Sequence, residues 1–194
     1  MLMRGDLEKV LFDEPAIHRR LDDMAAQISN DYRDRDLTVI AVLHGSLMFV
    51  ADLLRRIPLP LKLDCLSVSS YHGTVQSSGE VVFKLATASP SGGGQITLPD
   101  VVGRDVLVLD DILDSGFTLA AVRETLETAR PHSIRTCVLL SKKKRRAREV
   151  DIDYVGFEIE DEFVVGYGLD FRGRYRNLPY IGVLRRELLE QPDK

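Results

Sequence analysis

The segment from Val106 to Leu119, VLVLDDILDSGFTL, constrains the fold more than any other part of the chain. It begins with four apolar residues, which suit a strand buried on both faces of a parallel sheet. Two carboxylates, Asp110 and Asp111, follow at once, and an apolar pattern of helical spacing then runs from Leu119 until Pro131 stops it. We therefore predict a strand, a loop and a helix, with the loop at the strand's carboxyl end, where open α/β sheets bind ligands.

The predicted loop has the composition of a phosphate-binding site. Gly116 can take a positive φ, and the free N–H groups of residues 115 to 118 would point at one spot beside the hydroxyls of Ser115 and Thr118. Carboxylates repel phosphate, so the neighbouring acids need another purpose. They can accept hydrogen bonds from sugar hydroxyls while Mg²⁺ screens the remaining charge. The ligand that these residues imply is a phosphorylated sugar.

A second strand, turn and helix precedes this segment. Residues 38 to 43, TVIAVL, read as a buried strand, His44-Gly45-Ser46 follows, and an apolar helical pattern begins at Leu47 and is ended by Pro58. Two such units in one small chain imply right-handed crossovers and a parallel sheet. We also expect an amphipathic helix over residues 15 to 33 and strands over residues 63 to 69 and 134 to 140.

Composition limits the kind of protein. A chain of 194 residues with 44% hydrophobic and 29% charged residues has the size of about one domain with a proper core. A net charge of −4 and a pI near 5.6 argue against a protein that mainly coats nucleic acid. Cys65 and Cys137 lie in apolar, strand-like runs and are expected to be reduced. Neither a secretory signal nor a membrane span is evident, so we expect a cytoplasmic protein.

The segment VLVLDDILDSGFTL closely resembles the phosphoribosyl-pyrophosphate signature of type I phosphoribosyltransferases. FVVGYGLD at 163–170 and YRNLP at 175–179 are similar to segments that mark the 6-oxopurine branch of this family. The resemblance runs from about residue 7 to 184, in family order. It implies an enzyme of purine salvage that transfers phosphoribosyl to hypoxanthine or guanine. The implied α/β fold is a parallel sheet flanked by helices, in one domain over 1–194, with a core of about 36–160 and a small hood from about 1–14 and 161–194.

The resemblance also assigns roles to residues. Asp114, at the start of the loop, is the candidate general base for the purine nitrogen. Asp110 and Asp111 would hold the ribose, and the remaining binding residues fall into five groups: Ser115, Gly116, Phe117 and Thr118 for the 5′-phosphate; His44, Gly45 and Arg176 for pyrophosphate; Lys142, Phe163 and Val164 for the base; Ser70 and Tyr71 for a closing loop; and Asp170, with Asp110 and Asp111, for Mg²⁺. Family members usually form dimers or tetramers.

The family resemblance does not account for three features of the sequence. The family commonly has Lys where this chain has His44, so a fixed positive charge is replaced by a titratable one. Residues 143 to 148 continue a basic run after Lys142, and we expect them to be surface residues. The glycine-rich segment 86 to 98 has no functional interpretation.

Two other functions fit parts of the sequence. The main alternative is a regulator that keeps this fold but binds nucleic acid through the basic run 142–148; the acidic pI and the base-binding residues argue against it. A receiver-type phosphoacceptor domain also has an acidic pocket, but the chain lacks its expected lysine environment. The motifs do not rank hypoxanthine, guanine and xanthine as substrates.

Overall fold

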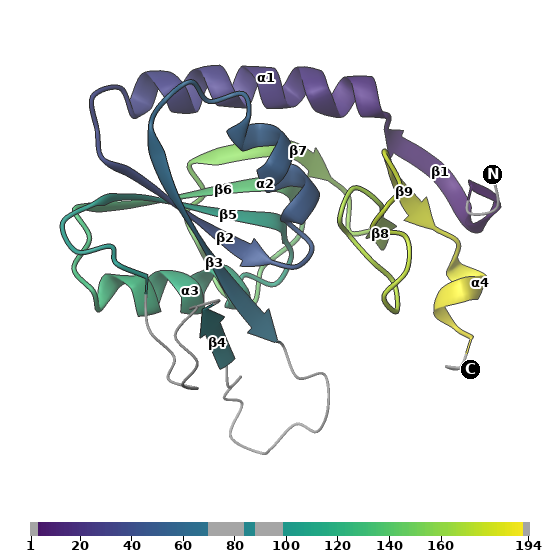
Figure 1. Ribbon diagram of the computed structural model, residues 1–194. Helices are drawn as coiled ribbons and strands as arrows, with labels where there is room; N and C mark the ends of the chain where they lie inside the picture. The colour runs from purple at the N-terminus through teal and green to yellow at the C-terminus, as the bar shows by residue number, and fades with distance from the viewer. Residues whose placement is uncertain (1–3, 70–83, 88–98, 192–194) are drawn as a thin grey trace, which may run out of the picture.

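The computed structural model describes residues 4–69, 84–87 and 99–191. Its main sheet has the strand order β4-β3-β2-β5-β6-β7, in which β4 is antiparallel to β3 and the other five strands are parallel (Figure 1). The strands of this sheet are β2 (Leu37–Leu43), β3 (Leu61–Ser69), β4 (Lys84–Thr87), β5 (Asp105–Leu113), β6 (Ser133–Lys142) and β7 (Tyr154–Ile159).

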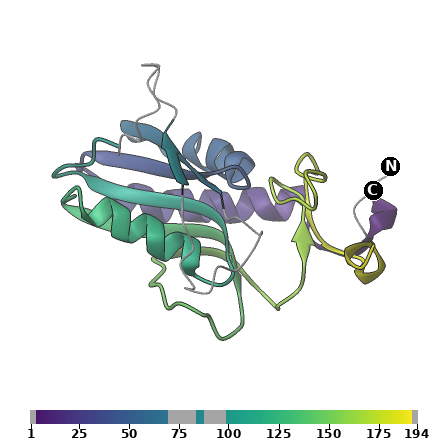
Figure 2. The same ribbon diagram turned by 90° about the horizontal axis from the view of Figure 1, so that it is seen from below.

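Helices cover both faces of the main sheet. The helices are α1 (Glu14–Asp31), α2 (Leu47–Leu54) and α3 (Phe117–Glu127). Side chains of β5 alternate between the two faces: Leu107 and Leu109 pack in the cluster that contains α1 and α2, whereas Val106 and Val108 pack in the cluster that contains α3. The helices therefore lie in layers above and below the sheet (Figures 1 and 2), which explains why the strand is apolar without alternation.

The two ends of the chain meet in a second sheet of order β1-β9-β8, in which neighbouring strands are antiparallel. Its elements are η1 (Arg4–Asp6), β1 (Leu7–Phe12), β8 (Val164–Val165), β9 (Ile181–Leu184) and the short helix α4 (Arg186–Leu189). These elements, with the loop between β8 and β9, are called the hood below, and they lie to one side of the main sheet (Figures 1 and 2). The predicted fold class, a parallel sheet flanked by helices with a small hood from the terminal segments, is confirmed.

One predicted boundary is wrong. The strand expected to end at Leu109 continues to Leu113, so the two acids belong to β5 and not to a loop. The neighbouring strand β6 is the physical reason, because it pairs with β5 as far as Leu113 and Ser141 and supplies partners for the backbone there. The carboxylates thus project from an ordered strand end.

Other predictions can be compared directly. The expected helix over 15–33 is α1, whose Asp13 side chain caps the helix by accepting from Ala16 N at 2.9 Å. Cys65 and Cys137 are free thiols; both were predicted to be core residues, and Cys137 is buried, whereas Cys65 is only half-buried. None of the helices in the described part of the chain is long and apolar enough to cross a membrane. Ser70 and Tyr71, and residues 88–98, lie outside the described residues.

Candidate functional site

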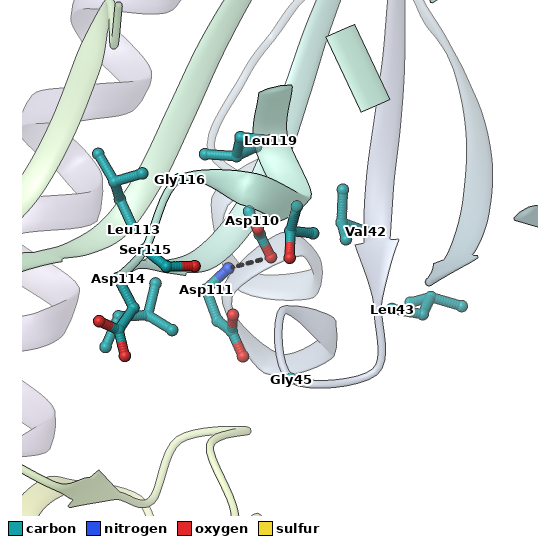
Figure 3. Close-up of a pocket in the computed structure, with 12 residues that line it drawn as sticks. Val42, Leu43, Gly45, Asp110, Asp111, Leu113, Asp114, Ser115, Gly116 and Leu119 are labelled. Carbon is teal, nitrogen blue, oxygen red and sulfur yellow. Dashed lines mark hydrogen bonds between the residues drawn. The ribbon is translucent and has the colours of Figure 1, made fainter. Parts of the chain in front are cut away.

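A cleft of about 320 Å³ opens at the carboxyl ends of β2 and β5, within the ~300–1,000 Å³ range of ligand sites. It unites the two strand-turn-helix units recognised in the sequence. The lining residues, drawn in Figure 3, are Val42, Leu43, Gly45, Asp110, Asp111, Ile112, Leu113, Asp114, Ser115, Gly116, Thr118 and Leu119.

Two neighbouring carboxylates form the floor of the cleft. Asp110 is only 6% exposed, and its Oδ1 accepts from the backbone N–H of Asp111 at 3.0 Å. Burial and the adjacent charge of Asp111 raise the pKa of Asp110 well above its usual value, and burial also raises the pKa of Asp111. Such a pair is stabilised by hydrogen-bond donors or a cation, so it is suited to sugar hydroxyls and a divalent ion.

The amino end of α3 also lines the cleft. Gly116 is its N-cap, with φ 87°, and no side chain among the described residues caps the helix there. The first N–H groups of a helix have no intrahelical acceptor and carry a partial positive charge. Ser115 is exposed and Thr118 is half-buried, beside this helix end. The segment predicted to bind phosphate therefore has the backbone geometry of an anion site.

A close backbone contact holds the amino end of α3 in place. A Cβ on Gly116 would lie 2.1 Å from the carbonyl oxygen of Arg148, and Arg148 N donates to Ser115 O at 3.0 Å. Only glycine leaves room for that carbonyl. The loop between β6 and β7 thus supports the phosphate-binding segment from behind.

The loop after β2 approaches the acids from the other side. A Cβ on Gly45 would lie 1.6 Å from Asp111 Oδ2, so glycine is required for the carboxylate to reach the loop, and Figure 3 shows the Asp111 side chain directed towards it. The Leu43–His44 peptide bond is cis, and the His44 side chain is exposed. The structure brings Gly45 and Asp111 together, as the sequence reading requires.

Asp114 lies at the end of β5 between two lysines. Its Oδ2 is 3.2 Å from Lys142 Nζ, and its Oδ1 is paired with Lys144; both amines also contact Asp161 Oδ1, at 3.1 and 3.0 Å. Burial favours the neutral acid, but the combined contacts with Lys144 and Lys142 outweigh it and lower the pKa of Asp114. Asp114 is therefore ionised near neutral pH and can accept a proton.

Phe163 and Val164, the residues expected at the purine, enter from the hood. Phe163 is 41% exposed and packs edge-on against Phe171 with ring centroids 5.5 Å apart, whereas Val164 is a buried residue of β8. An exposed aromatic ring is available for stacking. Neither residue lines the cleft around β5.

Asp170 and Arg176 face each other in the loop between β8 and β9. Arg176 Nη2 is 2.7 Å from Asp170 Oδ1, and Gly173 N donates to Asp170 Oδ2 at 2.8 Å. Arg176 also lowers the pKa of Asp111 electrostatically, against the larger effect of burial. Within 4–69, 84–87 and 99–191, no three His, Cys, Asp or Glu side chains are grouped to hold a metal. Asp110, Asp111 and Asp170 therefore do not form one ligand cluster.

The sequence did not indicate two residues that contact the candidate site, Lys144 and Asp161. Residues 143 to 148 were expected at the surface, yet Lys144 and Arg146 are half-buried: Lys144 contacts Asp114, and Arg146 Nη2 donates to Ser141 Oγ at 3.0 Å. Asp161, which follows β7, pairs with Lys142 and Lys144. Its place beside Asp114 follows from β6 and β7 lying in parallel, which a pattern of single residues does not reveal.

Comparisons with known proteins identify the arrangement. A model of the phosphoribosyl transferase domain family matches residues 9–172. A hypoxanthine-guanine phosphoribosyltransferase of Staphylococcus epidermidis is 44% identical over 187 residues, which cover 96% of this chain and 98% of that protein. One from Staphylococcus aureus is 41% identical over 186 residues, with the same coverage. A crystal structure of a hypoxanthine phosphoribosyltransferase from Staphylococcus aureus has a TM-score of 0.86 at 40% identity and covers 98% of both chains. The chain belongs to the phosphoribosyltransferase family, in its hypoxanthine-guanine branch.

Proposed function

We propose that this protein transfers the 5-phosphoribosyl group from phosphoribosyl pyrophosphate to hypoxanthine or guanine, giving the nucleotide and pyrophosphate. The observation that carries the proposal is the junction of three features in one cleft: the acid pair Asp110 and Asp111, the open end of α3 at Gly116, and the tight loop at Gly45. Together they suit the hydroxyl, phosphate and pyrophosphate groups of one ligand.

The phosphoribosyl group lies across the cleft in this proposal. The 5′-phosphate accepts from the N–H groups of residues 115 to 118, with the hydroxyls of Ser115 and Thr118 as further donors and Phe117 supplying backbone. The ribose hydroxyls donate to Asp110 and Asp111. Both sets of contacts hold the anomeric carbon in a fixed position, which lowers the entropic cost of the reaction.

Pyrophosphate is assigned to the opposite end of the cleft. His44, the backbone of Gly45 and Arg176 are the proposed donors. Mg²⁺ suits the acidic residues, since it binds through one or two carboxylates together with substrate oxygens; Asp110 and Asp111 would hold one ion and Asp170 another. The ion would neutralise charge on the leaving pyrophosphate.

The purine is assigned to Lys142 of the core and to Phe163 and Val164, where the chain enters the hood. Phe163 stacks on the ring, the backbone of Val164 meets its edge, and Lys142 donates to the 6-oxo group. The bond from the anomeric carbon to pyrophosphate breaks as the purine nitrogen attacks that carbon, which becomes cationic and oxocarbenium-like. Asp114 takes the proton from the purine nitrogen. Ser70 and Tyr71 are assigned to a loop that excludes water from this centre.

The wider setting is also proposed. We infer one domain with the core and hood limits stated from the sequence, a homodimer or homotetramer, and a cytoplasmic location. The competing role in nucleic-acid binding is weakened by the basic run itself, since Lys142, Lys143 and Lys144 each lie within 4 Å of an acidic oxygen.

The decisive experiment offers hypoxanthine, guanine and xanthine separately with phosphoribosyl pyrophosphate and Mg²⁺, and measures pyrophosphate release together with nucleotide formed. We expect equal amounts of both products with hypoxanthine or guanine. A protein that forms no nucleotide with any of the three bases, but binds nucleic acid with a steep dependence on salt, would overturn the proposal.

A further inference from the structure

A partly buried hydrogen bond joins the hood to the core next to the cleft. Tyr167, only 5% exposed, donates its hydroxyl to Asp52 Oδ2 at 2.5 Å. Asp52 lies on α2, whereas Tyr167 lies in the loop between β8 and β9, whose position beside α2 is visible in Figures 1 and 2.

The acceptor of this bond is itself held from two sides. Asp52 Oδ1 pairs with Arg55, and Asp52 Oδ2 lies 3.7 Å from His18 Nε2 of α1. Burial opposes ionisation, but the hydrogen bonds from Tyr167 and Arg55 outweigh it and lower the pKa of Asp52, so the acceptor is a carboxylate. Burial raises the pKa of Tyr167, followed by its bond to Asp52, so its hydroxyl stays protonated and donates.

Tyr167 is the centre of a turn with an unusual backbone. Gly166, Tyr167 and Gly168 have φ values of 100°, 52° and 102°, and a positive φ is uncommon for a tyrosine. Such a conformation persists only when its surroundings hold it. The backbone contributes to this, since Tyr167 N donates to Leu178 O at 2.9 Å, and the side-chain bond to Asp52 adds a second contact.

The turn touches the proposed pyrophosphate loop directly. A Cβ on Gly168 would lie 2.0 Å from the carbonyl oxygen of Gly45, so the two backbones are in close contact. Gly45 in turn lies against Asp111. The position of the turn therefore limits where the loop after β2 can lie.

The same turn supports the two charged residues that follow it. Gly168 N donates to Arg176 O at 2.9 Å, and Arg176 Nη1 donates back to Gly168 O at 2.7 Å. Arg176 is paired with Asp170. A shift of the turn would thus move the Gly45 loop, Arg176 and Asp170 together.

We propose that Tyr167 and Asp52 are positioning residues for the pyrophosphate end of the site: their hydrogen bond fixes the 166–168 turn against Gly45 and thereby sets the affinity for phosphoribosyl pyrophosphate. The inference rests on the proposed function, since it assigns this end of the cleft to pyrophosphate. It adds that α2, which supplies none of the proposed binding groups, controls their placement through Asp52.

The hood contains a matched control. Tyr175 is also buried, at 8% exposure, also has a positive φ, and donates its hydroxyl to Asp6 Oδ2 at 3.0 Å. Both partners of that bond belong to the hood, so it does not cross to the core. Tyr167→Phe and Tyr175→Phe each remove one hydroxyl from a partly buried tyrosine-aspartate bond, and any effect of general hood stability should be common to both.

The test compares the wild type with both variants. It measures the Michaelis constants for phosphoribosyl pyrophosphate and for hypoxanthine, the inhibition constant of pyrophosphate, and the melting temperature. Tyr167→Phe loses a hydrogen bond to a charged acceptor, and part of that loss should appear as weaker binding at the pyrophosphate end of the site. The Michaelis constant for phosphoribosyl pyrophosphate and the inhibition constant of pyrophosphate should each rise about five- to tenfold. The constant for hypoxanthine should change less than about twofold. Asp52→Leu, which removes the acceptor, should give the same pattern and Tyr175→Phe should not.

The inference is wrong if Tyr167→Phe and Tyr175→Phe change the two Michaelis constants alike, or if Tyr167→Phe lowers only the melting temperature. Failure of the proposed function looks different, because the wild type itself would then form no nucleotide. Asp52→Leu keeps a similar side-chain volume, lacks an acceptor and leaves Tyr167 unchanged, so it decides the question if Tyr167→Phe folds poorly.

Discussion

Asp114 is distinguished from the other cleft acids by the direction in which its pKa is shifted. Lysine contacts lower its pKa, whereas burial raises the pKa of Asp110 and Asp111. Acids in one site with opposite shifts usually have different roles. We predict that Asp114→Asn lowers kcat by about 10²- to 10⁴-fold, the range for loss of a general base. Equilibrium binding of phosphoribosyl pyrophosphate should remain within about twofold. Unchanged turnover in steady-state assays would remove Asp114 from the role of base.

Lys144 should tune the pH dependence of that step. Its contact with Asp114 favours the carboxylate, so Lys144→Met should raise the pKa of Asp114. Since the base works only when ionised, the acid limb of the kcat profile should move to higher pH, with loss of activity first at the acidic end. Lys143→Met is the matched control, because Lys143 lies 3.8 Å from Glu158 and Glu160 instead. Identical profiles for the two variants would contradict this role.

At the scale of the secondary-structure element, two turn glycines differ in what surrounds them. Gly116 and Gly103 both have positive φ, but a Cβ on Gly116 meets the Arg148 carbonyl, whereas a Cβ on Gly103 meets nothing within 4 Å. Gly103→Ala should therefore cost only backbone strain, about 1 kcal/mol of unfolding free energy, and leave kcat unchanged. Gly116→Ala should displace the amino end of α3 and weaken phosphoribosyl-pyrophosphate binding at least about tenfold. Chemical denaturation and binding titrations separate the two effects, and equal binding by both variants would refute the steric argument.

The elements show what a sequence can predict. Buried strands such as Val39 to Val42 and Val106 to Leu109 were predictable because an uninterrupted apolar run has few other uses. The end of β5 was not, since the two acids looked like a loop and only their pairing with β6 keeps them in the strand. The same limit applies to the site: Asp110, Gly116 and Gly45 were found from local patterns, but Lys144 and Asp161 depend on contacts between separate segments.

At the scale of the whole molecule, the hood links the two ends of the chain. β9 lies between β1 and β8, so the first strand of the sequence completes a sheet made of its last segments. Phe163 immediately precedes strand β8 of that sheet, and the loop between β8 and β9 carries Asp170 and Arg176, while the core carries the acids and the phosphate loop. Composition and periodicity alone do not predict this division, because short strands joined over the whole length of the chain leave no local pattern. Only the resemblance to a family indicated it.

Ligand binding should stabilise the whole molecule, and the size of the effect should depend on magnesium. A ligand at about one hundred times its dissociation constant adds about 2.7 kcal/mol. For a domain of this size each 1 kcal/mol moves the melting temperature by about 2 to 4 °C, so phosphoribosyl pyrophosphate with Mg²⁺ should raise it by about 5 to 10 °C.

Without the cation the same ligand places its negative charge beside Asp110 and Asp111, whose pKa burial already raises. The ligand must then be repelled by the carboxylates or bind together with their protonation, and either cost should reduce the shift. Thermal melts with phosphoribosyl pyrophosphate in Mg²⁺ and in EDTA measure the difference. Asp170→Asn should lose part of the magnesium-dependent increment and keep the remainder, since the acid pair is intact. An equal shift in Mg²⁺ and EDTA would mean that donors of the chain alone neutralise the ligand, and that the acids hold hydroxyls without a metal.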